Sequence, residues 1–409
     1  MEFLTIVYLT YIFLAFYFLF IYLLTYLQNK KQIYEVIRPK KDYSLSIVIP
    51  CYNEEDKIGE NIESHLNSDY KWLKKIIVVD DCSTDNSYEI IKKYSRKFPK
   101  VIALRTPKNT GRAAGPKNYG AKYVKTELIG FSDADSSPKP DAIKKMVGFF
   151  NNPKMGAVTS RVLVLNRKNK ISKIQAIEYK IIAFTRKLLG FLDSIYVTNG
   201  PLSIYRKEAF EEVGGFDMKN LTEDIEITWH FVSKGWNVAM AIPARAYTIV
   251  PDNLKDWFKQ RVRWNVGGLQ TIAKYRKQIR DTGMLGIFIM PFFTFSWILG
   301  LTGLLFLGYR IIQYIILRFL IAKYSLISEV ALISTNQFIL NPSILFFFGI
   351  ILFFLGLAYT FLALAHSREK GFDRHNFRDI FIYSFFYLLM YPPLLVYSFF
   401  KYLKGYESW

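Results

Sequence analysis

Apolar runs at both ends of the chain are long enough to cross a lipid bilayer, and they limit the possible folds more than any other feature. Residues 3–27 contain no Lys, Arg, Asp or Glu and are almost entirely apolar or aromatic. A hydrocarbon core of about 30 Å needs roughly 20 such residues in a helix. Similar runs occupy residues 285–307, 344–365 and 380–400. We therefore expect a membrane protein whose middle part folds outside the bilayer.

The first apolar run is predicted to be a retained membrane anchor. A signal peptide has a basic start, a shorter apolar core and a small-residue cleavage site. This run instead begins with Met1 and Glu2 and ends at a basic flank, residues 30–41. That flank and the basic loop at residues 367–378 are typical of cytosolic segments. The expected localisation is multi-pass in the cell membrane, with the middle domain in the cytosol.

Two features of the C-terminal apolar runs affect the length and the continuity of the predicted helices. Residues 311–321 are apolar but lie among Arg310, Arg318 and Lys323, so they either extend the preceding helix or lie in the interface. Pro392 and Pro393 fall inside the last run. They predict a kink or a break there, because proline lacks the N–H group that a helix needs.

Composition and charge restrict the partners. The chain has 409 residues, is 51% hydrophobic and carries a formal net charge of +20. Such an excess suggests lipid headgroups, nucleotide phosphates or nucleic acid. Nucleic acid is disfavoured, since the sequence has neither zinc-finger spacing nor an RNA-binding aromatic motif. Cys51 and Cys82 have no C-x-x-C neighbour, so we expect reduced thiols in a cytosolic domain.

The middle of the chain alternates short apolar runs with helical stretches. The predicted strands are residues 45–49, 76–79, 101–104, 128–131 and 202–205. Strands that alternate with helices predict an α/β fold with a mostly parallel sheet and crossover helices. Asn53 is expected to cap the first of these helices. No G-x-G-x-x-G follows a strand, which argues against a dinucleotide dehydrogenase.

Two longer amphipathic helices are also predicted. Residues 171–192 carry isoleucines and leucines between lysines and an arginine. This pattern is typical either of a helix on a membrane surface or of an ordinary domain helix. Residues 254–276 form the second helix, which includes Trp257 and Trp264.

Acidic residues follow two of the predicted strands and open one helix. Asp133 and Asp135 come directly after the strand at 128–131. Alternate residues of an extended segment share a face, so both carboxylates can converge on one target. Mg²⁺ commonly takes one or two carboxylates together with substrate phosphates. The same pattern also fits an ordinary polar loop. Asp81 follows another strand, and Thr222-Glu223-Asp224 opens a helix.

These acids, followed by Gln260-Arg261-Val262-Arg263-Trp264, resemble the motifs of membrane-embedded family 2 inverting glycosyltransferases. That family includes cellulose, chitin, hyaluronan and poly-N-acetylglucosamine synthases. The resemblance runs from about residue 46 to residue 264, and the last cluster fits Q-x-x-R-W. It implies a GT-A-type, Rossmann-like α/β domain flanked by transmembrane helices. The implied division is an N-terminal transmembrane anchor (residues 1–28), a cytosolic glycosyltransferase domain (42–250), an amphipathic interfacial helix with Q-x-x-R-W (251–282) and C-terminal transmembrane helices (283–409).

The resemblance implies a donor site for a nucleotide-sugar. Its implied nucleotide and diphosphate contacts are Tyr52, Glu54, Asp81, Arg112, Asp133, Gln260 and Arg263. Arg112 belongs to a stretch, residues 109–118, that is one residue longer than the usual family form and has Arg where Lys is usual. Asp135 is the implied ligand of a divalent cation, Mg²⁺ or Mn²⁺. Such a cation stabilises the charge that develops on a departing diphosphate.

The resemblance also implies an acceptor side. Asp224 matches the catalytic base, because inverting transfer needs a carboxylate that takes the proton of the attacking hydroxyl. Trp264 would stack on the acceptor sugar. Thr198, Asn199 and Gly200 match a loop beside the acceptor end, and Glu223 precedes the base.

The implied function is transfer of a sugar, expected from a UDP-sugar, to a growing polysaccharide with inversion to a β-linkage. Secretion of the polymer through the helices is an expected coupling. The alternative is transfer of a single sugar to a polyprenyl phosphate lipid, although such enzymes usually lack Q-x-x-R-W. A haloacid-dehalogenase-type phosphatase would use Asp133 and Asp135 but gives Asp224 no role. A non-catalytic transporter or scaffold is a further class. The sugar, the linkage and the oligomeric state stay open.

Overall fold

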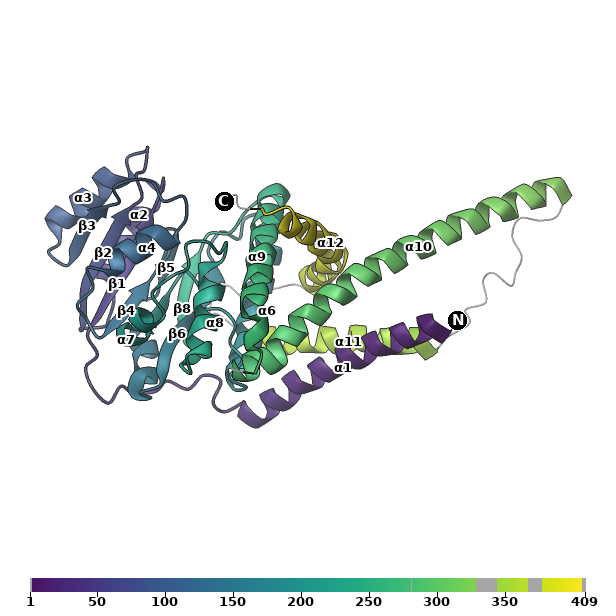
Figure 1. Cartoon of the computed structure of the whole chain (residues 1–409), viewed down its shortest axis with the longest axis horizontal. Helices are drawn as coiled ribbons and strands as arrows, with labels where there is room; N and C mark the ends of the chain where they lie inside the picture. The colour runs from purple at the N-terminus through teal and green to yellow at the C-terminus, as the bar shows by residue number, and fades with distance from the viewer. Residues whose placement is uncertain (1, 281, 329–343, 367–376, 407–409) are drawn as a thin grey trace.

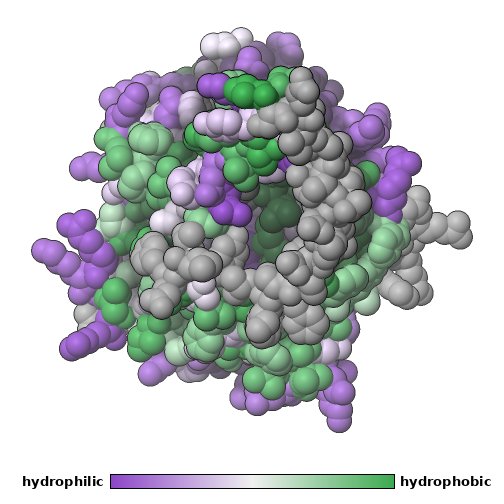
Figure 2. Space-filling view, turned by 90° about the vertical axis from the view of Figure 1, so that its right-hand side faces the viewer, coloured by the Kyte–Doolittle hydropathy of each residue, from purple (hydrophilic) through white to green (hydrophobic). Residues whose placement is uncertain are grey.

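A computed structural model of the chain describes residues 2–280, 282–328, 344–366 and 377–406. An α/β body lies at one end of the molecule, and long helices project from its other side (Figure 1). Seen from the end at which these helices project, hydrophobic residues cover much of the surface, and hydrophilic residues lie mainly around its edge (Figure 2). This distribution fits a soluble body attached to membrane helices.

An eight-stranded sheet forms the centre of the α/β body. Its strands are β1 (Leu45–Cys51), β2 (Leu73–Asp80), β3 (Val101–Arg105), β4 (Leu128–Phe131), β5 (Ser136–Pro138), β6 (Met155–Val164), β7 (Ser203–Arg206) and β8 (Asn237–Thr248). Their order in the sheet is β3-β2-β1-β4-β7-β6-β8-β5. Strands β1 to β4 are mutually parallel where they pair, and β6 is parallel to β8. Only β5 and β7 pair antiparallel to their neighbours in this sheet of the described residues. The predicted mostly parallel α/β fold is confirmed.

Helices cover both faces of the sheet. Those of the body are α2 (Ile58–Leu66), α3 (Ser87–Lys97), α4 (Ala114–Ala121), α5 (Ala142–Met146), α6 (Lys170–Gly190), α7 (Lys207–Glu212) and α8 (Glu223–Ser233). Side chains of a strand alternate between the two faces. Ile47 and Ile49 of β1 therefore join one hydrophobic core with Ile58 of α2, whereas Val48 joins the other core with Ala114 of α4.

The parallel strands place three loops at one edge of the sheet. β1 pairs with β2 on one side and with β4 on the other, and all three run in the same direction. The loops after Cys51, Asp80 and Phe131 consequently begin side by side. Ligands of open α/β sheets bind beyond such carboxyl ends.

Long apolar helices occupy the two ends of the chain. They are α1 (Glu2–Asn29), α10 (Met290–Ser328), α11 (Ile344–Ala365) and α12 (Phe377–Leu403). Thr5–Asn29, Leu285–Ile327 and Phe377–Leu403 are long and apolar enough to cross a membrane. In α11, the apolar part that the structure describes, Ile350–Ala365, is shorter than these three segments.

The structure shows how far α10 extends and whether α12 is broken at its two prolines. Residues 311–321 extend the preceding helix, because α10 continues without interruption to Ser328. α12 also continues through Pro392 and Pro393, so the helix has no break at that point. Neighbouring helices can satisfy the backbone groups that a proline frees. Residues 367–376 of the expected basic loop lie outside the described residues.

Two helices connect the body with the membrane helices. α6 packs on β6 and β8 with one side and on α11 and α12 with the other (Figure 1). The stretch predicted at 171–192 is thus an inner layer between sheet and membrane helices. α9 (Leu254–Tyr275), the predicted helix with Q-x-x-R-W, packs against α8 and α12.

Candidate active site

A cavity of about 910 Å³ lies beyond the carboxyl ends of β1, β2 and β4. Its wall continues over α6, α8 and α9 and reaches Trp297 of α10 and Tyr391 of α12. The predicted site residues that line it are Tyr52, Glu54, Asp81, Arg112, Asp133, Asp135, Asn199, Gly200, Glu223, Asp224, Gln260, Arg263 and Trp264. Residues more than 200 positions apart in the sequence therefore face one space.

Thr198 is the predicted site residue that the structure places behind the cavity wall. Its hydroxyl lies 3.3 Å from the carbonyl oxygen of Asp224 and 2.9 Å from the hydroxyl of Thr228. Tyr205 donates a further hydrogen bond to it at 2.8 Å. Thr198 thus contacts the backbone of Asp224 and supports it from behind the cavity wall.

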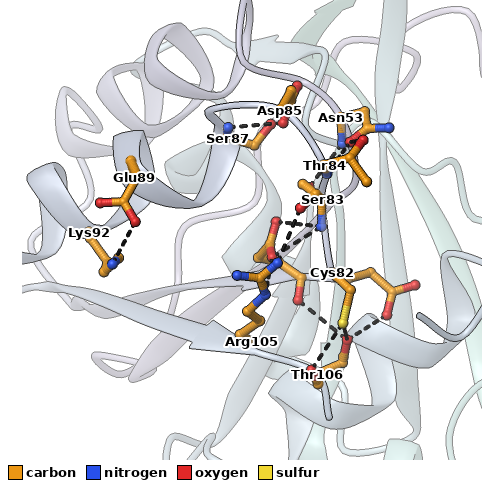
Figure 3. Close-up of polar contacts among 12 residues, drawn as sticks. Asn53, Cys82, Ser83, Thr84, Asp85, Ser87, Glu89, Lys92, Arg105 and Thr106 are labelled. Atoms are coloured by element: carbon orange, nitrogen blue, oxygen red, sulfur yellow. Dashed lines mark hydrogen bonds and ion pairs between the residues drawn. The ribbon is translucent and has the colours of Figure 1, made fainter. Parts of the chain in front are cut away.

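The loops after β1 and β2 are bound to each other (Figure 3). The side-chain oxygen of Asn53 accepts a hydrogen bond from the backbone N–H of Thr84 at 2.8 Å. Asn53 in turn donates its own N–H to the hydroxyl of Ser83 at 3.0 Å. The prediction that Asn53 caps the next helix is wrong, because α2 begins five residues later, at Ile58, and Asn53 bonds to the neighbouring loop instead. These bonds fix the segment that carries Tyr52 and Glu54.

Asp81 organises the glycine-rich turn before α4. One of its carboxylate oxygens accepts a hydrogen bond from the Thr106 hydroxyl at 2.7 Å, and the other accepts one from the Thr110 hydroxyl at 2.8 Å. Arg112, at the end of this turn, donates to the carbonyl oxygens of Met218 and Lys219, at 3.2 and 2.6 Å. The turn is therefore tied to the loop that precedes α8.

The loop with Asp133 is held closely from two sides. The N–H of Asp133 donates to the carbonyl oxygen of Gly200 at 3.1 Å. A Cβ atom at Gly200 would lie only 2.0 Å from a carboxylate oxygen of Asp133, so any larger residue there would displace that carboxylate. On the side of α2, the buried side-chain amide of Asn61 donates to the backbone carbonyl oxygens of Asp133 and Ser136, at 2.8 and 2.5 Å. The sequence analysis missed Asn61, whose helical position gave no signal.

Asp135 lies in an environment that disfavours its negative charge. Burial, together with the carboxylates of Asp133 and Glu54, raises the pKa of Asp135 to about 7. Its Oδ1 atom lies 3.2 Å from the Ser136 hydroxyl and 3.4 Å from the Thr248 hydroxyl. A hard divalent cation suits such an oxygen-rich group. Within the described ranges, no group of three His, Cys, Asp or Glu side chains could hold a metal ion by itself. A cation bound to Asp135 would therefore also need oxygen atoms from a bound substrate.

Lys117 is a buried cation that the sequence analysis did not assign. Its Nζ atom lies 2.9 Å from Glu223 and 3.4 Å from Asp133. Burial opposes its charge, but the two carboxylates outweigh that effect and raise the pKa of Lys117 above its ordinary value. The signal was present, since Lys117 belongs to the glycine-rich stretch at residues 109–118.

Asp224 lies in the first turn of α8 and faces the cavity. Burial and the neighbouring Glu223 carboxylate raise the pKa of Asp224 to about 7. A carboxylate with a pKa near neutrality is suited to accept a proton in the course of a reaction. Thr222, two residues before Asp224, packs closely against Gly267 of α9. A Cβ atom added at Gly267 would lie 2.2 Å from the Thr222 hydroxyl.

Arg261 is the centre of the Q-x-x-R-W cluster. It forms a buried ion pair with Glu178 of α6. It also donates to the side-chain oxygen of Gln260 at 2.6 Å, and its guanidinium lies 4.1 Å from the ring centre of Trp264. Arg261 thereby holds two predicted ligand-binding side chains. Trp257, by contrast, is buried against Phe386 of α12.

Comparisons with known proteins agree with this geometry. The sequence profile described as glycosyl transferase family 2 matches residues 46–214. A poly-beta-1,6-N-acetyl-D-glucosamine synthase of Staphylococcus epidermidis is 30% identical over 287 residues, which are 69% of this chain and 68% of that protein. The chain belongs to glycosyl transferase family 2. A synthase of the same name from Staphylococcus aureus (strain MSSA476) is 29% identical over 250 residues, 61% of this chain and 60% of that one.

A solved structure has a similar fold along the whole glycosyltransferase. It is a mannosyltransferase from Pyrobaculum calidifontis in complex with GDP-Man and Mn²⁺. It covers 97% of this chain and 99% of its own, with a TM-score of 0.57 and 16% identity. The likeness concerns the fold.

Proposed function

We propose that this enzyme extends a β-linked N-acetylglucosamine polymer from UDP-N-acetylglucosamine. The observation that carries the proposal is that Asp133, Asp135 and Asp224 face the same cavity as Gln260 and Trp264. The names of the relatives support the sugar and the polymer. A phosphatase would have no use for Asp224 or the Q-x-x-R-W helix.

The donor would bind at the loops after β1, β2 and β4. Tyr52 would pack on the base, and Glu54 would accept a hydrogen bond from it. Gln260 and Arg263 would hold the diphosphate, since a guanidinium offers a fixed fork of donors. Asp135, together with phosphate oxygens, would hold a divalent cation, whose charge would offset the burial and the neighbouring carboxylates that disfavour the Asp135 anion. Such a cation stabilises negative charge on a leaving diphosphate.

Asp224 would act as the base on the acceptor side. The acceptor hydroxyl gives its proton to Asp224 while its oxygen bonds to the anomeric carbon. The bond from that carbon to the diphosphate breaks at the same time, and UDP leaves with the electron pair. Attack from the face opposite the diphosphate inverts the configuration. Trp264 would stack on the acceptor sugar and orient it, and Thr198 would support Asp224 from behind.

The path of the cavity supports a processive enzyme. Its wall runs from the nucleotide loops to Phe293 and Trp297 of α10 and Tyr391 of α12. A growing chain would leave the acceptor side toward these membrane helices. In this arrangement residues 42–250 form the cytosolic domain, and the helices of residues 1–28 and 283–409 anchor it by several spans.

Product analysis tests the proposal. Purified enzyme in detergent is supplied with UDP-N-acetylglucosamine and Mg²⁺ or Mn²⁺, with UDP-glucose as the matched donor control. A polymer from the first donor, hydrolysed by a hexosaminidase specific for β-linkages, is expected. A single sugar on added polyprenyl phosphate, with no polymer, would instead favour the lipid acceptor.

A further inference from the structure

Arg186 is a buried cation in the cavity wall with few partners. It belongs to α6, is 8% exposed, and lines the cavity. Among the residues that the structure describes, it donates one hydrogen bond, to the side-chain oxygen of Asn199, and forms no ion pair. Its Nε atom is buried without a partner. A buried charged group is costly unless hydrogen bonds or an opposite charge compensate it.

The neighbouring Asn199 is fixed so that its oxygen serves Arg186. The backbone N–H of Asn199 donates to the Thr159 hydroxyl at 2.9 Å. Its side-chain NH₂ donates to the carbonyl oxygen of Ser160, also at 2.9 Å. These two bonds turn the amide oxygen of Asn199 toward the guanidinium of Arg186, which donates a hydrogen bond to it.

The position of Arg186 is on the acceptor side of the cavity. Asn199 directly follows Thr198, which bonds to the backbone of Asp224. The guanidinium carbon lies 5.9 Å from the ring centre of Tyr196, and Tyr196 packs on Phe293 of α10 with ring centres 5.1 Å apart. Arg186 therefore lies between the predicted base and the membrane helices.

The surroundings of Arg186 limit the chemistry of its ligand. Ile182, Tyr196 and Val197 give the wall next to it an apolar character. The acceptor side of the cavity also carries the carboxylates of Glu223 and of the proposed base, Asp224. A further anion on that side would be repelled by these two groups, so a neutral hydrogen-bond acceptor fits better. Arginine has only donors, and a carbonyl oxygen only accepts, whereas a hydroxyl does both.

An acetamido group combines a carbonyl oxygen with a methyl group, which matches a donor beside an apolar wall. We propose that Arg186, supported by Asn199 and flanked by Tyr196, forms the subsite that binds the acetamido group of the acceptor sugar. The inference rests on the proposed transfer to an N-acetylglucosamine chain. It makes Arg186 a determinant of acceptor specificity, separate from the donor site.

Steady-state kinetics with two acceptors test this subsite. The full-length enzyme receives UDP-N-acetylglucosamine with either a β-linked N-acetylglucosamine tetramer or the corresponding glucosamine tetramer. The wild type should prefer the acetylated acceptor. Arg186→Gln should raise KM for that acceptor about tenfold or more, because a charged hydrogen bond is lost. It should leave the donor KM unchanged and remove most of the preference. Lys173→Gln, an exposed change on the same helix, is the matched control.

Several results would overturn the inference. A wild type that uses both acceptors equally, or an Arg186→Gln enzyme that keeps the preference, would exclude an acetamido subsite. A donor KM that rises in place of the acceptor KM would assign Arg186 to the donor. Arg186→Lys, which keeps the charge without the planar fork, should retain part of the preference, and its complete loss in this variant together with an unchanged acceptor KM would also contradict the subsite. If the wild type transfers no N-acetylglucosamine at all, the proposed function itself fails.

Discussion

The ammonium group of Lys117 lies 2.9 Å from Glu223 and 3.4 Å from Asp133. One buried cation in the wall of the cavity thus joins the loop after β4 to the start of α8. In the proposed mechanism this contact connects the donor side with the acceptor side.

Replacement of Lys117 should damage stability and turnover together. Lys117→Met keeps much of the volume but leaves the buried Glu223, and the partly exposed Asp133, without their cation. Removal of one partner of a buried pair costs about 3–5 kcal/mol. We expect a lower midpoint of thermal unfolding in detergent and little UDP release. Lys122→Met, an exposed change next to the same helix, should change neither. A Lys117→Met enzyme with wild-type stability would contradict the role of this ion pair.

The ion pair between Glu178 and Arg261 allows stability and activity to be separated. Glu178→Gln leaves Arg261 buried without its counter-ion, so a loss of about 3–5 kcal/mol is expected. Glu178→Leu combined with Arg261→Leu should recover much of that stability, because an apolar pair avoids the desolvation cost. Activity should stay low in the double variant, since Gln260 and Trp264 lose the side chain that holds them. Thermal unfolding and UDP release measured side by side check both outcomes. Full activity of the double variant would show that Arg261 does not position them.

Gly200→Ala should weaken donor binding. The new methyl group would meet an oxygen of Asp133 at 2.0 Å and displace that carboxylate. Overpacking of this kind costs about 1–3 kcal/mol. A cost of this size in donor binding raises the donor KM about 5- to 150-fold. Gly356→Ala serves as the control, because no atom lies within 4 Å of its added Cβ. An unchanged donor KM in Gly200→Ala would mean that Asp133 is not a donor contact.

The rate should depend on pH through Asp224. Burial and Glu223 raise the pKa of Asp224 to about 7. A base must be deprotonated, so kcat should be low well below that pH, rise through it and then level off. Profiles of kcat in saturating donor check this. A rate that is flat from about pH 5.5 to 8.5 would remove Asp224 as the titrating base.

The sequence predicted those parts of the molecule that depend on local pattern. The strands that include residues 45–49, 76–79 and 128–131 follow from short apolar runs, and Thr222 marks the start of α8. The apolar runs likewise predicted the projecting helices. Family motifs then identified thirteen of the residues that line the cavity.

Contacts between distant segments could not be predicted in this way. Lys117 and Glu223 are 106 residues apart, and Arg261 and Glu178 are 83 residues apart. Periodicity along one helix does not reveal which charged side chain of another helix it will meet. The mistaken cap at Asn53 has the same cause, because its partner, Thr84, lies on the loop after the next strand. No local pattern distinguishes Arg186 from the other basic residues of α6, so its place in the cavity wall could not be predicted.

The most direct test of the account compares the wild type with Asp224→Asn in UDP binding and in polymer synthesis. Asparagine keeps the shape of the side chain but cannot take the proton. Asp224→Asn should bind UDP with Mn²⁺ as tightly as the wild type, while polymer formation from UDP-N-acetylglucosamine falls by about 10²–10⁴-fold. Polymer synthesis at the wild-type rate in this variant would contradict the assignment of Asp224 as the base, and with it the proposed mechanism.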